Sequence, residues 1–473
     1  MEDTFGNSQS IGVVGGGLVG CLSALAFAAK GYSVSLFERR PNPSKETTVK
    51  DLVSINLAVS ERGLEALRYV NHSLAQRVLD NSIPMKGRMI HDKTGKKQES
   101  IIYGLFGECI RSIDRSLLNN LLLEELENWE IKVYFDHKFI ELDRYEPDSI
   151  SHRIKFVDLS LNETNKTRSY EFDFVIGADG AHSQFRYQMQ KQMRMDYSQK
   201  YIDMQYLELH IDSAPKKEEN RFRLDPNHLH IWPRKSYMLI ALPNVDGSFM
   251  CTYFSPWSQM ESFKNADEFA NFFKNAFPDA YDLMGKDHVE SAFANHKRGY
   301  LMQNSSYPYH HPLGRALIIG DAAHLMVPFY GQGLNCGFED VHFLMKLIDK
   351  NPGNIIHSFS LYSEQRKSDL DTICHLAMQN YFEMALKVTQ ASYLFRKKLD
   401  YFLGKYVSGR FIKWIPMYTM ISFRADIPYS RALAIEKRQS KILYVLEKGT
   451  IISIVALGVI KFSGIWKNWS RSL

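Results

Sequence analysis

The sequence predicts an α/β protein in which a Rossmann-like βαβ domain is interrupted by a β-sheet domain and followed by a helical C-terminal region. Three observations indicate this order. A glycine-rich turn joins an apolar strand to an Ala/Leu-rich helix near the N-terminus, strand-like segments crowd the middle of the chain, and a second strand, loop and helix begin at Ala316. Helical periodicity then runs from about 358 to 403.

The composition is that of a globular protein with a large core. The 473 residues are 45% hydrophobic and 23% charged, which is enough for two or three domains. The five cysteines are widely spaced without a CxxC pair. We therefore expect neither a disulfide framework nor a metal site, and a reducing compartment fits best.

The chain shows no repeat, low-complexity tract or Pro/Gly/Ser-rich linker, so its domains are expected to be interleaved. The expected divisions are 1–195 for the first part of the βαβ domain with substrate-site elements near 83–104, 196–304 for a β-rich substrate domain, 305–350 for the second part of the βαβ domain, 351–440 for helices that contribute to the substrate site, and 441–473 for a tail.

Periodicity also gives the expected elements. In the first part we expect helices at 18–30 and 116–129 and strands at 11–14, 33–38, 131–135, 139–142, 154–159 and 170–176. The middle is expected to be strand-rich, with strands at 206–211, 228–233 and 237–242.

The glycine-rich turn, Gly15-Gly16-Gly17-Leu18-Val19-Gly20, matches the GxGxxG pattern between a strand and a helix. Gly15 permits the tight turn, Gly17 lets backbone N–H groups approach a pyrophosphate, and Gly20 lets the helix pack against the strand. The helix N-terminus adds a partial positive charge. Glu38 ends the next strand, where its carboxylate would accept both ribose hydroxyls. The pattern predicts dinucleotide binding.

Glu38 also narrows the choice of dinucleotide. A carboxylate at this position favours an unphosphorylated ribose, which disfavours NADP as the occupant although Arg39 and Arg40 follow directly. NAD and FAD both remain open on this motif alone.

The segment from 316 to 335 decides between them in favour of FAD. An apolar strand delivers Gly320 and Asp321, and the Asp321 carboxylate could accept a ribityl hydroxyl. The loop from Pro328 to Gly333 then opens a helix near Leu334, whose N-terminus could stabilise negative charge on a reduced flavin. An enzyme that used only NAD would have no need of this segment.

These two segments, with the stretch 173–186 between them, resemble the three fingerprints of the FAD-dependent aromatic hydroxylases. The middle fingerprint contains Asp179-Gly180. The resemblance implies that this pair helps to bind the FAD pyrophosphate and takes part in NAD(P)H binding, which agrees with the lack of a second GxGxxG in the chain.

Four further stretches resemble the fungal members of the branch that hydroxylates L-kynurenine, namely 54–63, 84–91, 228–234 and 414–423. With the fingerprints they extend the resemblance over essentially the whole chain. It implies an NADPH-dependent FAD monooxygenase that converts L-kynurenine and O₂ to 3-hydroxy-L-kynurenine through a flavin C4a-hydroperoxide, in tryptophan catabolism and NAD biosynthesis. The flavin itself activates O₂, so no residue need act as a covalent nucleophile.

The resemblance also implies site residues. It places Arg88 and Tyr103 at the substrate carboxylate, with Asn380 and Tyr418 as further substrate contacts, and an Arg fork with a phenol suits a carboxylate. Pro328, Phe329 and Tyr330 would lie near the flavin. The implied cofactor contacts are Gly15, Gly17, Val19, Gly20, Phe37, Glu38, Arg39, Arg40, Ala58, Arg115, Phe139, Asp179, Gly180, Asp321, Gly333, Leu334 and Asn335. The chain departs from the branch at Tyr330, where a Phe is usual, and at Leu334, where a Met is usual.

The C-terminus concentrates the positive charge of the chain. Residues 396–473 hold 15 Lys and Arg against 4 Asp and Glu, and the mostly apolar run 449–466 has Lys461 as its only charge. This predicts a membrane anchor, although a buried terminal helix would suit the same run. The resemblance implies the mitochondrial outer membrane, and the polar N-terminus without a leader pattern indicates a catalytic body facing the cytosol.

Two alternatives share the same fold. One is an FAD monooxygenase for another aromatic substrate, which would have no use for Arg88 and Tyr103 as a carboxylate clamp. The other is a non-catalytic binding protein, which would purify without flavin. We also expect His228 and His230 to be packed or hydrogen-bonded side chains, because no third ligand lies nearby in the sequence, and Ser60 to be a helix N-cap.

Overall fold

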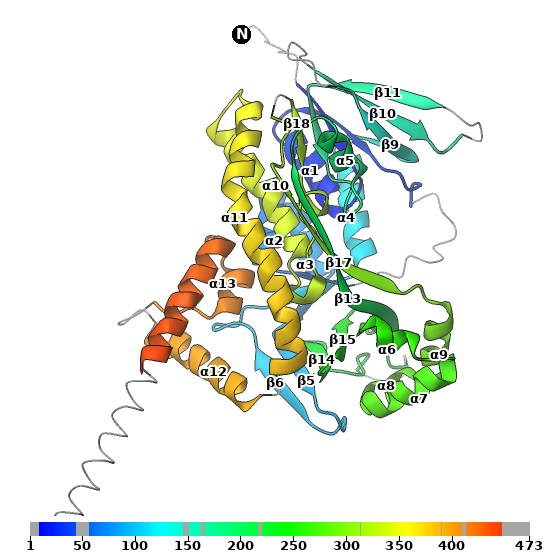
Figure 1. Cartoon of the computed structure of the whole chain (residues 1–473), viewed down its shortest axis with the longest axis vertical. Helices are drawn as coiled ribbons and strands as arrows, with labels where there is room; N and C mark the ends of the chain where they lie inside the picture. The colour runs from blue at the N-terminus through cyan, green and yellow to red at the C-terminus, as the bar shows by residue number, and fades with distance from the viewer. Residues whose placement is uncertain are drawn as a thin grey trace, which may run out of the picture.

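A computed structural model describes residues 9–43, 56–144, 151–161, 166–215, 220–312, 314–388, 390–408 and 413–446. Its elements form two layered bodies joined by long strands, with helices covering one side (Figure 1).

A five-stranded parallel sheet forms the centre of the first body, in the order β18-β12-β1-β2-β8. Its strands are β1 (Ser10–Val14), β2 (Ser33–Phe37), β8 (Lys132–Tyr134), β12 (Phe174–Gly177) and β18 (Ala316–Ile318). Helices α1 (Leu18–Ala28), α4 (Arg115–Asn128) and α10 (Gly333–Lys350) pack around it. The strands are apolar and mostly buried, as a parallel sheet covered by helices requires.

A seven-stranded sheet forms the second body, in the order β17-β13-β16-β15-β14-β5-β6. Its strands are β5 (Gly87–His91), β6 (Gln98–Ile102), β13 (Asp196–Ile211), β14 (His228–Arg234), β15 (Tyr237–Pro243), β16 (Phe249–Ser255) and β17 (Gly299–Tyr307). All neighbours pair antiparallel except β14 and β5, which are parallel. The pairing brings residues 87–102 to the sheet formed by the middle of the chain.

The middle of the chain is less strand-rich than its sequence suggested. Between β16 and β17 it forms α6 (Trp257–Glu261), α7 (Ala266–Ala276), α8 (Pro278–Met284) and α9 (Lys286–Asn295). Phe269, Phe273 and Phe277 recur at a spacing of one helical turn and are fully buried against the sheet. The strands expected at 206–211, 228–233 and 237–242 are present, but these helices were not expected, because aromatic residues suit a strand and a buried helix face equally.

Two small sheets complete the first body. They consist of β3 (Leu57–Val59), β4 (Ile83–Met85) and β7 (Ile110–Ile113), and of β9 (His137–Leu142), β10 (His152–Asp158) and β11 (Thr167–Phe172). The remaining helices of this body are α2 (Glu61–Val70), α3 (His72–Asp80) and α5 (Gln184–Gln190).

The strand expected at 170–176 is divided at Asp173. Residues before it belong to β11 and residues after it to β12, in different sheets. The Asp173 carboxylate accepts hydrogen bonds from the backbone N–H and hydroxyl of Ser10, at 2.7 and 2.8 Å. This side chain therefore holds the chain where it passes from one sheet to the other.

The helical tract expected at 358–403 is also broken. The structure has α11 (Ile355–Phe382), a π-helical turn (Glu383–Lys387), α12 (Ala391–Phe402), a second π-helical turn (Leu403–Val407) and α13 (Met417–Phe423), followed by a helix over 429–446. No helix within the described residues is both long and apolar enough to cross a bilayer. Most of the expected anchor, from residue 447 onward, lies outside the described residues.

Arg62 on α2 holds the C-terminal region against the first body. Its buried guanidinium donates to the carbonyl oxygens of Ile421 and Met420, at 2.6 and 3.1 Å, which lie in the last turn of α13. The C-terminal carbonyls of a helix have no partner within the helix, so a buried cation satisfies them and complements the helix dipole. This contact positions Tyr418 on α13.

Candidate active site

In the turn after β1, two glycines have no space for a side chain (closed positions) and one has space for it (an open position). A Cβ atom on Gly15 would lie 2.4 Å from the carbonyl O of Ala178, and one on Gly20 would lie 1.8 Å from the carbonyl O of Gly15. Gly15 also has a φ of 110°. A Cβ atom on Gly17 would meet nothing within 4 Å. The closed positions hold strand and helix together, and the open one leaves the backbone accessible to a phosphate.

Glu38 lies directly beyond β2, and its carboxylate accepts the Gly16 N–H at 2.7 Å and Arg40 Nε at 2.9 Å. Burial acts to raise the pKa of Glu38, but the hydrogen bonds and charge of Arg40 keep it below its ordinary value. Arg39 is exposed. The Phe37 ring is buried and stacks on the rings of Tyr134 and Phe156, which leaves only its backbone for a ligand.

The N-terminal glycine-rich segment and the segment 316–335 meet at Val19 on α1. A Cβ atom on Gly320 would lie 3.1 Å from its methyl groups, and one on Gly337 would lie 2.6 Å away. Asp321 follows in a 3₁₀ turn (Gly320–Ala322). Burial raises the pKa of Asp321, and the positive charge of Arg115 at the start of α4 acts against that rise.

The loop before α10 is held by the Asn335 side chain. Its Oδ1 accepts the Ser60 N–H at 2.8 Å, and its Nδ2 donates to the carbonyl oxygens of Ala58 and Gly331 at 2.7 and 2.8 Å. The loop contains a 3₁₀ turn (Pro328–Tyr330), and Gly331 has a φ of 67°. Gly333 and the partly buried Leu334 begin α10. Asn335 therefore shapes the loop with its side chain.

Asp179 also uses its side chain within the protein. The carboxylate accepts the Phe185 N–H at 2.9 Å and the Ser183 hydroxyl at 2.5 Å, which holds the start of α5. Gly180 has a φ of 83°, and its Cβ position is open. Phe139 packs on the rings of Phe156 and Phe185. The Asp179 carboxylate and the Phe139 ring thus have structural partners, and the backbone beside them is what a cofactor would meet.

These residues fit FAD. Apart from chain neighbours, no atom of the described residues lies within 4 Å of the Cβ positions of Gly17, Gly180 and Gly333, which follow β1, follow β12 and begin α10, respectively. Glu38 lies at the β2 end of this edge, and Asp321 lies at the β18 end. This edge of the parallel sheet therefore has a carboxylate at each end and accessible backbone N–H groups between them. A dinucleotide with a ribityl chain requires acceptors for its hydroxyl groups and N–H donors for its phosphates.

A cavity of about 270 Å³ adjoins the other body. Arg88 on β5 is buried at its wall, with its guanidinium carbon 5.6 Å from the Tyr103 ring centre and 5.2 Å from that of Tyr418. The two rings are stacked with centres 4.6 Å apart. The β5–β6 hairpin region and α13 thus place a cation beside a stacked pair of phenols.

Polar atoms at this cavity lack partners in the protein. Arg88 Nε and the Tyr103 hydroxyl oxygen are buried and make no hydrogen bond of good geometry among the described residues, although the Tyr103 hydroxyl lies near the polar groups of Arg88 and Tyr418. Buried polar atoms are normally satisfied, so two such atoms side by side indicate a ligand with acceptor oxygens. The oxygens of a ligand carboxylate could accept a hydrogen bond from both atoms.

Sequence analysis missed Glu383 and Tyr393, which also line this cavity. Glu383 Oε1 lies 3.6 Å from Arg88 Nη1 and accepts the Tyr393 hydroxyl at 2.5 Å. Burial acts to raise the pKa of Glu383, but the charges of Lys397 and Arg88 keep it below its ordinary value. Glu383 follows Asn380 by about one helical turn, and this spacing was the available signal.

The cavity and the cofactor region meet at the loop before α10. Asn380 Nδ2 donates to the carbonyl O of Phe329 at 2.5 Å. The Tyr330 ring lies 5.8 Å from that of Tyr418, nearly parallel to it. Tyr330, the position that departs from the branch, therefore faces the aromatic wall of the cavity.

The two histidines on β14 bind other protein groups. His230 bonds His91 Nε2 and the carbonyl O of Asp225, both at 2.8 Å, and His228 bonds the Asp225 carboxylate at 2.8 Å. Both hydrogen-bonded roles agree with expectation. Ser60 stands at the N-cap of α2 as expected, but its hydroxyl makes no capping bond.

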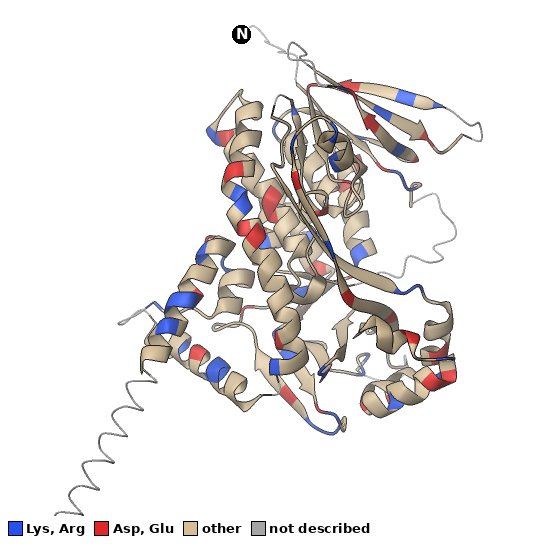
Figure 2. Ribbon diagram, in the orientation of Figure 1, with Lys and Arg blue, Asp and Glu red and all other residues tan. Residues whose placement is uncertain are grey.

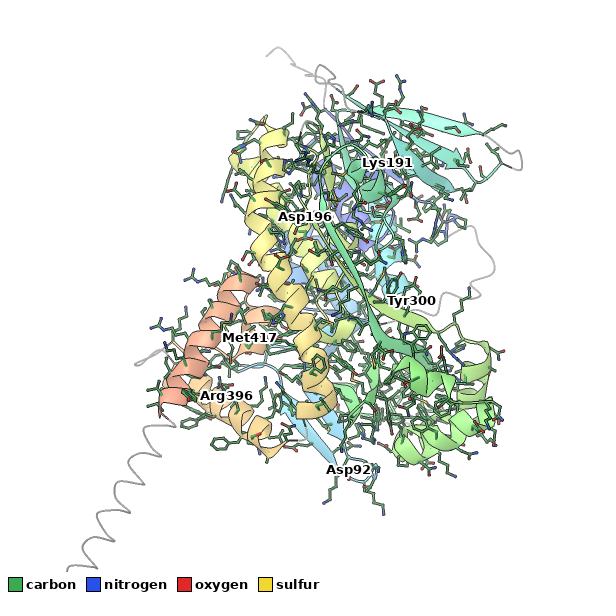
Figure 3. All side chains as sticks on the ribbon, viewed as in Figure 1. Asp92, Lys191, Asp196, Tyr300, Arg396 and Met417 are labelled. Atoms are coloured by element: carbon green, nitrogen blue, oxygen red, sulfur yellow. The ribbon has the colours of Figure 1, made fainter. Side chains whose placement is uncertain are left out.

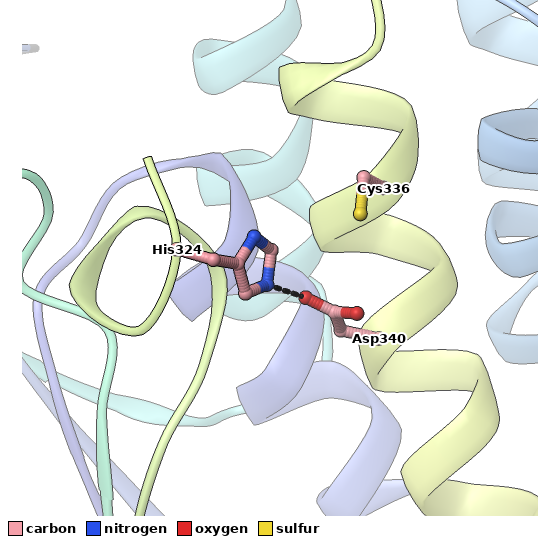
Figure 4. A group of neighbouring side chains, drawn as sticks. All are labelled: His324, Cys336 and Asp340. Atoms are coloured by element: carbon pink, nitrogen blue, oxygen red, sulfur yellow. Dashed lines mark hydrogen bonds and ion pairs between the residues drawn. The ribbon is translucent and has the colours of Figure 1, made fainter. Parts of the chain in front are cut away.

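Three buried side chains elsewhere have the composition of a metal site, His324, Cys336 and Asp340 (Figure 4). The Asp340 oxygens are used by His324 Nε2 at 2.5 Å and by Arg366 Nε at 2.8 Å. Arg366 Nη2 also lies 3.7 Å from Cys336 Sγ. A metal ion would have to sit beside this buried guanidinium, so the group is better described as an ion-pair network.

Relatives of known name cover nearly all of the chain. Residues 8–351 match the family described as FAD binding domain. The chain is 60% identical to kynurenine 3-monooxygenase of Debaryomyces hansenii, over 96% of each chain. It is 56% identical to the kynurenine 3-monooxygenase of Candida albicans over 98% of each chain, and 45% identical to that of Saccharomyces cerevisiae over 96% of this chain and 98% of the relative.

Solved structures share the fold at low sequence identity. A tetrameric form of 2-methyl-3-hydroxypyridine-5-carboxylic acid oxygenase matches with a TM-score of 0.63 at 16% identity, covering 82% of this chain and 96% of its own. CtdE in complex with FAD matches with a TM-score of 0.62 at 15% identity, covering 84% and 99%. With the fold shared and close relatives matched end to end, the chain belongs to the kynurenine 3-monooxygenase family of FAD-binding proteins.

Proposed function

We propose that this protein hydroxylates L-kynurenine at ring position 3, with FAD as cofactor and with NADPH and O₂ as co-substrates. The names of its relatives support the substrate. The observation that carries the proposal is the pair of unsatisfied atoms at the cavity, Arg88 Nε and the Tyr103 hydroxyl. A hydroxylase for an aromatic ring without a carboxylate would leave both unsatisfied, at a cost of about 1–3 kcal/mol each.

The cavity suits an amino acid in its zwitterionic form. Arg88 and Tyr103 would receive the carboxylate, and Glu383, 3.6 Å from Arg88, would accept from the ammonium group. Tyr418 stacks on Tyr103 and would pack along the side chain of the substrate. An amino acid held at Arg88 would extend its aromatic ring toward Phe329 and Tyr330, the loop that Asn380 ties to the cavity.

FAD, when bound, supplies the redox chemistry and the activation of O₂. The tasks left to the chain are to bind, to orient and to exclude water. Phe329 is buried against the rings of Phe254 and Tyr381, at 5.2 and 4.7 Å, and these rings would keep the reacting end of the substrate dry. Gly17 and Gly333 would hold the pyrophosphate and flavin ends with backbone N–H groups.

NADPH as the reductant rests on the resemblance of the Asp179-Gly180 segment. Glu38 is bonded by Arg40, and a carboxylate in that place disfavours a 2′-phosphate at the FAD site. NADPH would therefore bind elsewhere, at a transient site. Comparing oxidation of NADPH and NADH by the holoenzyme with saturating kynurenine tests this, and a preference for NADH would contradict it.

The direct test of the reaction uses purified full-length protein. We expect a yellow protein with a flavin spectrum that NADPH bleaches faster when L-kynurenine is present, with 3-hydroxykynurenine formed in step with NADPH consumed. A panel of aromatic acids and amines should stimulate less. A colourless protein would point to a non-catalytic binder, and stronger stimulation by another compound would point to a different substrate.

Attachment to the mitochondrial outer membrane through 441–473, with the body in the cytosol, is part of the same proposal. The basic and apolar sequence of this tail supports it. Removing residues from Glu447 onward should release an active enzyme from the membrane fraction. Loss of folding on truncation would instead assign the tail to the core.

A further inference from the structure

The outward side of α12 carries aromatic rings where a surface helix normally carries polar groups. Phe395, Phe402 and Tyr406 are 70%, 53% and 64% exposed. Phe402 follows Phe395 by two helical turns, so the two rings project from the same side, and Tyr406 follows one turn later. Of the 12 residues of α12, all of them described, only Asp400 is buried. Tyr393 and Leu394 of this helix line the cavity, whereas Phe395, Phe402 and, in the π-helical turn that follows, Tyr406 form an aromatic strip that faces away from the protein.

Neighbouring segments extend this surface. Ile102 at the end of β6 is 59% exposed and Phe106 in the following loop is 74% exposed. The loop lies against the end of α12, because a Cβ atom on Gly404 would lie 2.9 Å from Leu105. Lys398 and Lys405 on the same stretch are exposed, and Lys405 Nζ lies 5.7 Å from the Tyr406 ring centre. Figure 2 shows basic residues along α12. We call the docking face the set Ile102, Phe106, Phe395, Lys398, Phe402, Lys405 and Tyr406.

The described chain ends beside the docking face. Arg396 Nη2 on α12 donates to Glu436 Oε1 at 3.1 Å, which joins α12 to the helix over 429–446. Figure 3 shows Arg396 on the same side of the molecule as Met417 at the start of α13. Val445, one residue before the end of the described helix, is 59% exposed. The sequence that follows is mostly apolar from 449 to 466, with Lys461 as its only charged residue.

We infer that the docking face lies against the headgroup region of an anionic lipid bilayer, an inference that rests on the membrane attachment proposed above. Aromatic rings with lysines among them are the side chains that a membrane interface selects, and each lysine is attracted to anionic lipid. Interfaces between proteins are depleted in lysine, which disfavours a second copy of the chain. The tail would then tether the body and the docking face would orient it.

The orientation has a consequence for the substrate cavity. Ile102 and Lys398 of the docking face also line that cavity, together with Arg88 and Tyr103. A bilayer against the docking face would therefore border the cavity that binds substrate. A polar amino acid would have to approach along the headgroups.

Hydrogen exchange of the full-length holoenzyme tests the inference. Backbone amides of 391–407 should exchange at least several-fold more slowly on vesicles of phosphatidylcholine with phosphatidylserine, because docking suppresses local opening of the helix. Amides of α5, at the opposite end of the molecule, should not change. The double variant Phe395→Ser with Phe402→Ser should lose this protection while its tail still binds vesicles. Tyr187→Ser, which removes an aromatic ring 51% exposed on α5, is the matched control and should keep it.

The outcomes separate the two proposals. If the wild type does not bind these vesicles, membrane attachment fails and this inference fails with it. If it binds without slower exchange at 391–407, or with slowing that the double variant retains, the tail attaches but the docking face does not touch lipid. Slow exchange that rises with protein concentration without vesicles would assign the face to a second copy. Slow exchange at every concentration without vesicles would assign it to residues 447–473.

Discussion

The cofactor region and the proposed substrate cavity differ in whether backbone or side-chain atoms shape them. The cofactor region is shaped by backbone, with closed glycines at 15 and 20, an open one at 17, and the ends of parallel strands beside them. The proposed substrate cavity is shaped by side chains, with Arg88 and Tyr103 from the β5–β6 hairpin region, Glu383 from the end of α11 and Tyr418 from α13. Backbone geometry suits a cofactor common to many enzymes, and side chains suit the selection of one substrate.

The two regions are nevertheless joined. Asn380, about one helical turn before the cavity residue Glu383, donates to the carbonyl O of Phe329, and Arg62 holds α13, which carries Tyr418, on the cofactor body. If the comparison is right, damage to glycines should remove the cofactor, and damage to cavity side chains should leave the cofactor in place.

The largest effect is expected at Gly20. Alanine there would put Cβ 1.8 Å from the carbonyl O of Gly15, and the overpacking should cost about 3 kcal/mol or more, enough to prevent recovery of the yellow protein. Gly17→Ala is the matched control, because its Cβ meets no protein atom. It should keep the secondary structure and melting behaviour of the apoprotein but bind FAD more weakly. Equal stability losses for the two variants would contradict this division.

The next largest effect, on kcat/KM, is expected when Arg88 is replaced. Replacement by Met keeps the volume but removes the proposed partner of the substrate carboxylate and leaves Glu383 with Lys397 as its nearest cation, at 3.7 Å. We expect kcat/KM for L-kynurenine to fall by roughly a thousandfold, on the order of 4 kcal/mol, while flavin content stays the same. Arg88→Lys should recover part of the loss. A variant that loses flavin in proportion to activity would show that the two regions are not separable.

Lowering the pH should reduce the free energy of unfolding of the body that contains the seven-stranded sheet and borders the cavity. Burial lowers the pKa of His230, on the strand beside Arg88, to about 4. The unfolded chain therefore takes up this proton first, so the stability contribution is complete above pH 6.5 or so and is lost as the pH falls toward 4. At pH 5 the loss should be about 2 kcal/mol. Thermal unfolding at pH 7.5 and pH 5 should show a smaller pH effect in His230→Gln than in the wild type; an equal effect would assign it to other groups.

The smallest effect is expected at Glu383. Glu383→Gln keeps the shape and removes the charge that we assign to the substrate ammonium, so KM should rise by about tenfold with little change in kcat. An analogue of kynurenine without the α-amino group should not distinguish the variant from the wild type. If it does, the carboxylate of Glu383 acts on Arg88 instead of the substrate.

Sequence patterns predicted the cofactor region better than the cavity, and the reason is physical. The turn at 15–20 is local, so strand, glycines and helix identify one another within a short stretch. Asp173 gave no such signal, because nothing in its neighbours indicates that its partner is Ser10, 163 residues away. The helices at 257–295 were missed because buried phenylalanines suit strands and helices alike.

The prediction of the cavity residues depended on the resemblance to a known family. Arg88 and Tyr103 read alone as a surface cation and a packed ring, and only the fold shows that both are buried with atoms left unsatisfied. Glu383 was not predicted at all, since a charge at the end of a long helix usually faces water. Its role depends on Tyr393 and Arg88, which come from other elements.

The most direct test asks whether Arg88 recognises a carboxylate independently of the cofactor. The measurement compares kcat/KM for L-kynurenine with that for the amine in which hydrogen replaces the α-carboxylate, in the wild type and in Arg88→Met, at equal flavin content. We predict that the wild type prefers L-kynurenine by roughly a hundredfold or more and that the variant shows almost no preference. A preference that survives in the variant would contradict the assignment of this cavity.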